Sequence, residues 1–244
     1  MHTATMKNYL LAMLLLVGSV GHAAAQVVAT VTHLSGVLTS RHQDGTTKVM
    51  SVKSEVQRGD TLLTEKSTFA RLKFNDNSEI VLRPGSELRV DQFNYDESKP
   101  EADSLVINMI KGGMRAVSGL IGKRSRNAVQ YTTPTATIGI RGTHFGALFC
   151  DNNCTDVPTV GGTAPPNGLH VDVAQGAIEL TNSGGAVRVN TGEFGYVVSR
   201  TSLPILVTPE RGVQVTMPTS ISQNKSTSVG GMAKGSAETQ CAAQ

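Results

Sequence analysis

The stretch TFARLKFNDNSEIVLRPGSELRV, residues 68–90, decides the fold class. Within FARLKF (69–74), apolar side chains alternate with basic ones, and this period of two is typical of a half-buried β-strand. The polar run 75–78 then predicts a turn, because Asn and Asp tolerate left-handed backbone and hydrogen-bond to it locally. The apolar alternation restarts at 80–82 and, after a second turn, at 88–90. The stretch therefore predicts short strands joined by tight turns.

Similar units recur along the chain and predict an all-β protein. Short runs rich in Val, Ile, Leu and Thr alternate with turn residues at spacings of about 8–12 residues, which is typical of a sandwich, a barrel or a β-solenoid. We expect many short, mostly antiparallel strands in a sandwich-like or solenoid-like stack. Further strands are predicted at 27–40 (with a break near Ser35–Gly36), 105–110, 114–117, 171–173, 178–180 and 187–189, with a hairpin turn at 43–46 and turns at 111–113, 175–176 and 182–185.

The first 25 residues have the three parts of a secretory signal. Lys7 precedes a short apolar run at 9–17, and small residues lead to an Ala-x-Ala site ending at Ala25. The apolar run is shorter than the ~20 residues that span a bilayer. We therefore expect a cleaved signal peptide at 1–25; an uncleaved membrane anchor is the alternative. Translation could start at Met1 or Met6.

Charge gives no indication of a nucleic-acid partner. The formal net charge is only +3, and a nucleic-acid protein needs a concentrated basic face. The basic cluster 123–126 is interpreted as a solvated loop, with an anionic partner as the alternative. No segment after the export signal is apolar enough to cross a membrane, so the processed chain is not expected to be membrane-spanning.

The cysteines predict one small disulfide and no metal site. In an oxidising compartment Cys150 and Cys154 could close a short loop, which leaves Cys241 free or paired with another chain. The cysteines and histidines do not stand at ligand spacings, so we expect neither a metal nor a cofactor.

Composition divides the remaining chain into a domain and a tail. The folded domain is expected at 26–216, with an exposed excursion rich in Pro and Gly at 150–168 and a charged loop at 93–103. Residues 217–244 are rich in Ser, Thr, Gly and Ala, which predicts a disordered, low-complexity tail.

The order of several short motifs resembles the FecR-type periplasmic domain. The resemblance covers residues 35–198, interrupted by the excursion, and depends on the order of the motifs more than on any one of them. The motifs are Arg58–Thr64, Phe69–Leu72, Asn77–Leu82, Ile110–Met114, Thr133–Ala136, Ile140–Phe145, Val171–Thr181 and Gly192–Glu193.

This resemblance implies a non-enzymatic, all-β periplasmic domain. In the iron-citrate regulator that names the family, the domain belongs to a membrane-spanning protein that relays the state of an outer-membrane receptor to a cytoplasmic sigma factor. Here we expect a cleavable hydrophobic segment with no cytoplasmic region before it. We therefore expect an exported, stand-alone form of the sensing domain.

Within the motifs, one set of residues is expected to shape the backbone. Arg141 is expected to lie between strands, where its guanidinium donates to carbonyls or to a carboxylate such as Asp60, so that Arg141→Ala would lower stability sharply. Ligand binding by Arg141 is the alternative. The full set is Gly59, Asp60, Gly112, Gly113, Pro134, Gly139, Arg141, Gly142, Thr143 and Gly176.

Three functions are consistent with these features. The leading hypothesis is an interaction or signalling module that binds an envelope protein or a cell-wall polymer through the exposed loops 93–103, 123–126 or 150–168. A structural component of an envelope assembly is the second. The third is a polysaccharide enzyme with paired carboxylates, Glu79 with Glu87 or Asp172 with Glu179; an aromatic content of 4% and the absence of Trp are unfavourable for sugar stacking.

Overall fold

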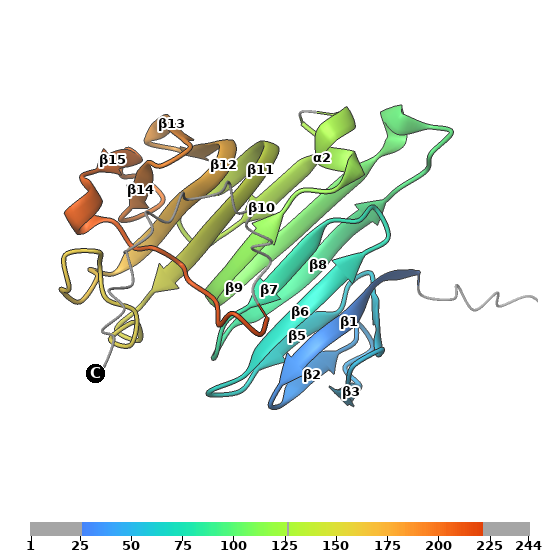
Figure 1. Cartoon of the computed structure of the whole chain (residues 1–244). Helices are drawn as coiled ribbons and strands as arrows, with labels where there is room; N and C mark the ends of the chain where they lie inside the picture. The colour runs from blue at the N-terminus through green and yellow to red at the C-terminus, as the bar shows by residue number, and fades with distance from the viewer. Residues whose placement is uncertain (1–25, 126, 222–244) are drawn as a thin grey trace, which may run out of the picture.

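The computed structural model describes residues 26–125 and 127–221, and they form an all-β fold, as predicted (Figure 1). The predicted signal peptide, Arg126, Cys241 and most of the predicted tail lie outside these ranges. The strands are β1 (Val27–Ser35), β2 (Leu38–Arg41), β3 (Thr47–Met50), β4 (Glu55–Gln57), β5 (Thr61–Thr64), β6 (Phe69–Phe74), β7 (Glu79–Leu82), β8 (Glu87–Asn94), β9 (Ser104–Val117), β10 (Val129–Thr132), β11 (Thr137–Cys150), β12 (Gly168–Asn182), β13 (Gly185–Asn190), β14 (Phe194–Val197) and β15 (Ile205–Val207). The helical pieces are η1 (Pro100–Ala102), α2 (Leu120–Arg124) and η2 (Pro209–Arg211).

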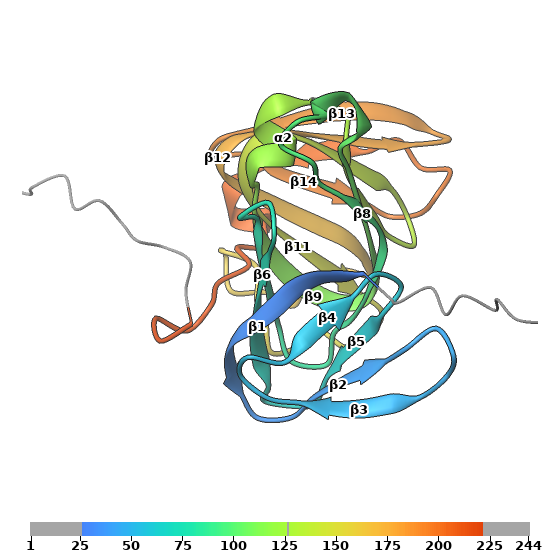
Figure 2. The same cartoon turned by 90° about the vertical axis from the view of Figure 1, so that its right-hand side faces the viewer.

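The strands form one hydrogen-bonded sheet that folds into two layers. Layer A has the order β4-β1-β6-β7-β9-β11-β12-β14-β15, and layer B has the order β3-β2-β5-β8-β9-β10-β11-β12-β13. β9, β11 and β12 belong to both layers because each is long and bends from one into the other. Seen from the side, β6 and β8 lie on opposite sides of the molecule (Figure 2). Among the pairings of the described residues, only β9 with β10 is parallel.

Glycines mark the three bends. Gly112 in β9, Gly142 in β11 and Gly176 in β12 have φ of +77°, +60° and +80°, which non-glycine residues rarely adopt. The predicted turns at 111–113 and 175–176 are therefore wrong, because the chain continues through both sites as a single strand. A glycine with positive φ inside a strand produces a bulge that changes the strand's direction without reversing it.

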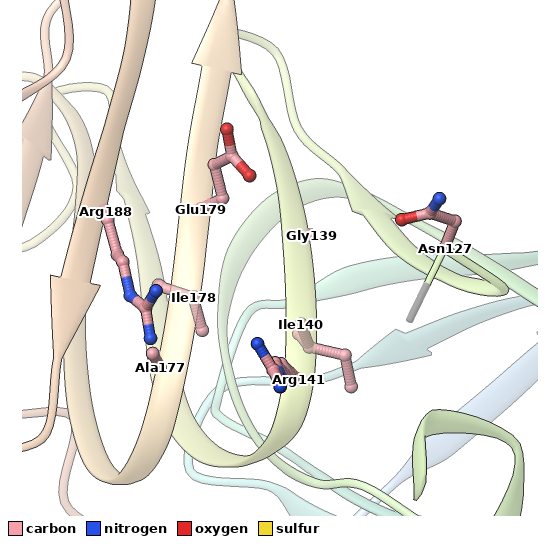
Figure 3. A pocket seen from close by; sticks show the side chains of 8 residues that line it. All are labelled: Asn127, Gly139, Ile140, Arg141, Ala177, Ile178, Glu179 and Arg188. Atoms are coloured by element: carbon pink, nitrogen blue, oxygen red, sulfur yellow. The ribbon is translucent and has the colours of Figure 1, made fainter. Parts of the chain in front are cut away.

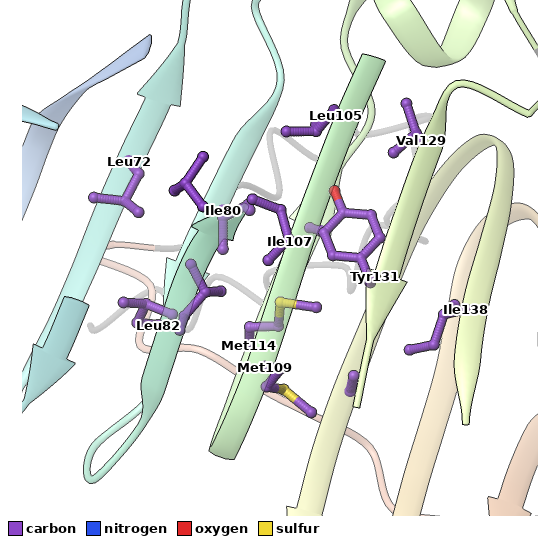
Figure 4. Close-up of a cluster of buried hydrophobic side chains, with 14 of the residues drawn as sticks. Leu72, Ile80, Leu82, Leu105, Ile107, Met109, Met114, Val129, Tyr131 and Ile138 are labelled. Atoms are coloured by element: carbon purple, nitrogen blue, oxygen red, sulfur yellow. The ribbon is translucent and has the colours of Figure 1, made fainter. Parts of the chain in front are cut away.

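One hydrophobic core lies between the layers. Its side chains come from both layers in alternation along the strands (Figure 4). Tyr131 of layer B packs edge-on against Phe145 of layer A, with 5.1 Å between ring centroids, and Phe74 packs against Phe93 at 5.8 Å. Each fully buried large apolar side chain contributes about 1.5–3 kcal/mol relative to exposure. Burial of these side chains between the two layers therefore stabilises the fold.

Two irregular segments cover the outer face of layer A. The segment between β11 and β12, residues 151–167, contains no strand, and a disulfide joins Cys150 to Cys154 at its start. Residues 213–221, which we call the strap, follow η2 and lie across several strands of layer A (Figure 1, orange to red). The predicted domain end at 216 is too early, because Ile221 is buried and Met217 packs against a hydrophobic cluster.

No helix within residues 26–125 and 127–221 has both the length and the apolar character that crossing a bilayer requires.

Candidate functional site

The strand register aligns six residues across the outer face of layer A. For five of them the neighbours along the strand lie in the core, so the alternation of a β-strand directs these residues away from it. We call this set the cross-strand row. It consists of Arg71 (β6), Val81 (β7), Arg115 (β9), Gly146 (β11), Asp172 (β12) and Phe194 (β14), each paired with the next.

Arg115 makes a buried ion pair at the centre of the row. Its Nη2 donates to Oδ2 of Asp172 at 3.0 Å, and its Nε donates to Nε2 of His144 at 2.8 Å. The side chains of Arg115 and Asp172 are only 8% and 7% exposed. Gly146 stands between them in register, and its lack of a side chain leaves room for them to meet. Because burying two charges costs several kcal/mol, such a pair is stable only when each partner is fully hydrogen-bonded.

The strap completes these hydrogen bonds. The backbone N–H of Val215 donates to Oδ1 of Asp172 at 2.9 Å, and the carbonyl of Val215 accepts from Nη1 of Arg115 at 2.6 Å. Val215 also fills the space above Gly146, where a Cβ would lie 2.5 Å from the Cβ of Val215. Val215 of the strap therefore contacts the row both through its main chain, with two hydrogen bonds, and through its side chain.

Two further arginines bind strap carbonyls. Nη1 of Arg83, which follows β7, donates to the carbonyl of Thr216 at 2.8 Å, and Nη2 of Arg71 donates to the carbonyl of Ile221. With Arg115, three arginines that lie in or directly after neighbouring strands of layer A donate to the backbone of one segment. The strap is thus held by side chains that bind its main chain.

Apolar contacts hold the same segment as well. Val213, Val215 and Met217 alternate with exposed residues and pack into a cluster separate from the main core. The rest of this cluster is Leu148, Cys150, Cys154 and Val157, so the disulfide-closed excursion and the strap share one small core. A hollow of about 750 Å³ beside it is lined by Phe69, Arg83, Leu148 and Val157 among others.

Stability is expected to depend on pH through His144. Burial, aided by the charge of Arg115, lowers the pKa of His144 to about 4 from its ordinary 6.5. Between these values the unfolded chain binds a proton that the folded chain does not, so stability should fall as the pH drops from about 6.5 towards 4. Burial raises the pKa of the neighbouring Asp172, which acts in the opposite sense in the acid range.

A non-titrating variant isolates the histidine. His144→Gln keeps an acceptor for Arg115 but cannot be protonated, so urea unfolding at several pH values should show a shallower loss of stability for this variant. Parallel curves for the two proteins between pH 7 and 4.5 would show that His144 does not contribute.

The predicted pair of Arg141 with Asp60 is wrong. Asp60, which follows the turn at Gly59, is buried and accepts hydrogen bonds from Nδ1 of His42 at 2.6 Å and from the N–H of Gln57 at 2.9 Å. Arg141 lies instead on the exposed outer face of layer B. A local pattern could not reveal this, because β11 bends one residue later and directs Arg141 away from layer A.

Several of the other predicted residues meet at the bends. A Cβ on Gly176 would lie 2.5 Å from the carbonyl oxygen of Gly142, so the bends of β11 and β12 are in contact. Thr143 is buried there and donates through Oγ1 to the carbonyl of Ala177 at 2.9 Å. Gly112 and Gly113 lie against Ser86 at the β9 bend, and Pro134 lies in the β10–β11 turn.

Arg141 borders a small hollow on layer B (Figure 3). The hollow has a volume of about 240 Å³, and its charged residues are Arg141, Glu179 and Arg188. Gly139, paired with Glu179 across the strands, forms part of its lining. This hollow is lined by both polar and apolar groups, and among the described residues no three His, Cys, Asp or Glu side chains gather as metal ligands.

Arg141→Ala is now expected to leave stability nearly unchanged. The guanidinium is exposed and no strand depends on it, so the free energy of unfolding should change by less than about 0.5 kcal/mol. Thermal and urea unfolding of the variant beside the wild-type protein measure this. A loss of several kcal/mol would restore the structural role expected from the sequence.

The structure also places the predicted carboxylates and loops. Asp172 is buried in its ion pair with Arg115, and Glu179 is exposed on layer B, beyond the bend of β12. Glu87 pairs with Arg41 and Lys111.

The loops 93–103 and 123–126, which were expected as separate surfaces, contact each other. Arg124 of α2 donates to Asp103 at 2.7 Å, and its guanidinium lies 4.9 Å from the ring centroid of Tyr95.

Comparison with known families identifies a region that contains five of the six residues of the row, all except Phe194. Residues 60–179 match the family model of the FecR protein. The chain carries a FecR domain. The match includes Arg115, His144 and Asp172, together with the bends at Gly112, Gly142 and Gly176.

Solved structures show partial likeness to this FecR-domain chain. Two crystal structures of a candidate anti-sigma factor from Parabacteroides distasonis have 13% sequence identity and TM-scores of 0.45 and 0.44, with 62% of this chain and 60% of that chain covered. A cell surface anchoring domain has 24% identity and a TM-score of 0.25, with 25% of this chain and 82% of that chain covered. No curated protein gives a significant match.

Sequence reasoning missed Arg115, Asp172 and the strap as parts of one site. Arg115 falls in the predicted strand at 114–117 without a role of its own, and Asp172 is considered only as half of an enzymatic carboxylate pair. A signal was present in the alternation Val213-x-Val215-x-Met217, which has the period of a strand with one buried face.

Proposed function

We propose that this protein is a non-enzymatic interaction or signalling module of the bacterial cell envelope. The FecR-family match over residues 60–179 carries the proposal, since it supports a signalling or regulatory role. The chemistry of the site agrees with it: the buried ion pair is committed to the fold, and the row binds polypeptide backbone.

The proposal includes export to the periplasm. Residues 1–25 act as a cleaved signal peptide, the FecR-type domain follows from residue 26, and a low-complexity tail lies after the strap. Two observations support this arrangement: the three-part pattern of the first 25 residues and the disulfide between Cys150 and Cys154, which suits an oxidising compartment.

Capture from envelope extract tests the proposed function. The tagged full chain is expressed in a bacterium, the periplasmic fraction is collected, and the N-terminal residue is determined, which should be Gln26. Crosslinked complexes are then compared with those of the same bait unfolded in urea. Recovery of one envelope protein by the folded bait alone supports the function. If repeated captures recover no partner that depends on folding, the proposal fails.

An exposed sheet edge favours a second candidate, a structural component of an envelope assembly. β15 ends layer A, and large apolar side chains are exposed on it and before it: Val198, Leu203, Ile205 and Leu206. Exposed apolar edge strands promote pairing with other chains. Light scattering at increasing concentration would show a series of oligomers if this candidate is correct, and a monomer if it is not.

A further inference from the structure

The cross-strand row presents the hydrogen-bonding pattern of a receptor for an extended main chain. Three arginines donate to carbonyl oxygens of the strap. Asp172 accepts from the N–H of Val215, the same residue whose carbonyl accepts from Arg115. Donors for carbonyls together with an acceptor for an amide suit a polypeptide. A simple anion would have no hydrogen to offer the buried carboxylate.

Side-chain contacts add a preference for apolar residues at alternate positions. Val213, Val215 and Met217 fill one side of the strap, and Gly146 provides the space into which Val215 fits. The intervening Gln214 and Thr216 are exposed, so their identity matters little. Peptide recognition elsewhere combines main-chain hydrogen bonds for affinity with alternate side-chain pockets for specificity.

The strap is held differently from a strand. In the described part of the chain, its hydrogen bonds to layer A all involve side chains of the sheet, and none is a backbone-to-backbone ladder bond. Releasing it would leave every strand pairing of layer A intact. Proteins open locally at free energies below that of global unfolding, and segments that bind ligands are drawn from the low end of this range.

We propose that the strap is an internal ligand, and that the cross-strand row binds an extended segment of a partner polypeptide with the same pattern, Val-x-Val-x-Met or its apolar equivalents. The strap and the partner segment compete for the row. This inference rests on the proposed function and names the surface and the partner chemistry that the function would use.

A peptide-binding experiment on the full chain tests this. Val213→Asp combined with Val215→Asp should release the strap while the row stays unchanged. The probe is a fluorescent synthetic peptide with residues 211–221, RGVQVTMPTSI. The double variant should bind it at least about tenfold more tightly than the wild-type protein, because the wild-type protein binds only in the fraction of molecules whose strap has lifted.

Matched controls accompany the measurement. Gln214→Asp with Thr216→Asp adds the same charge at the exposed strap positions, and this variant should bind the peptide as weakly as the wild-type protein. A peptide with both valines changed to Asp should not bind any variant. Lack of binding by a folded strap-released variant would overturn the inference. So would strap exchange between two copies, seen as a dimer by light scattering, which would assign the row to a second copy.

Hydrogen exchange on the wild-type protein keeps the test independent of how the variant folds. The amide of Val215 should exchange by local opening, faster than the amides of β11. Exchange only through global unfolding would make the strap a fixed part of the fold and overturn the inference.

Envelope capture separates this inference from the proposed function. If wild-type and strap-released chains capture the same partner equally, the inference fails while the proposed function stands.

Discussion

Replacing Arg115 by alanine is expected to lower the free energy of unfolding by about 3–5 kcal/mol, because the substitution leaves the carboxylate of Asp172 buried without its partner. The same change removes the donor to the carbonyl of Val215 and the donor to His144. For a domain of this size, the melting temperature should fall by roughly 6–20 °C. Urea unfolding and thermal melting followed by circular dichroism measure the loss.

Two comparisons separate the ion pair from simple loss of volume. Arg115→Lys keeps the charge but not the planar fork that reaches Asp172, His144 and Val215 together, so it should lie between wild type and alanine. Arg115→Met with Asp172→Leu removes both charges and should recover part of the loss, since apolar pairs often replace buried ion pairs without cost. A loss below about 1 kcal/mol for Arg115→Ala would contradict the central place of the pair.

Gly176→Ala is expected to be the second most damaging substitution, with a loss of about 2–5 kcal/mol. The residue has a φ of +80°, and its Cβ would lie 2.5 Å from the carbonyl oxygen of Gly142. Backbone cannot move aside as a flexible side chain can, so the bends of β11 and β12 would have to separate. Equilibrium urea unfolding of the variant gives the value.

Gly192→Ala is the matched control for this prediction. Gly192 has nearly the same φ, +82°, but no atom lies within 4 Å of the position of its Cβ. Only the conformational cost of about 1–2 kcal/mol should therefore remain. Equal losses for the two variants would show that the contact between the bends contributes nothing beyond backbone conformation.

Local patterns identified the strands but misread two of the bends. The period of two in β6, β7 and β8 predicted strands there because the alternation is local and one face of each strand is buried. The glycines at 112 and 176 predicted turns, because a chain reversal and a bulge both require positive φ. Only the pairing partners on both sides distinguish the two outcomes.

The roles of Arg141 and Arg115 could not be predicted from the residues around them in the sequence. Arg141 stands between glycines in the most conspicuous motif, yet it is exposed. Arg115 stands in an ordinary alternating strand, yet it organises the outer face of layer A through Asp172 and Val215. Nothing within a few residues of either arginine indicates which one a covering segment will bury.

The sequence by itself determined the all-β class, because the alternation within each strand is local, and the FecR resemblance, because the order of the motifs can be read along the chain. Only the tertiary structure decided which side chains meet. The cross-strand row assembles residues from 71 to 194, and the strap that covers it comes later still. Register between distant strands sets these contacts, and register depends on the burial of a shared core that no local pattern describes.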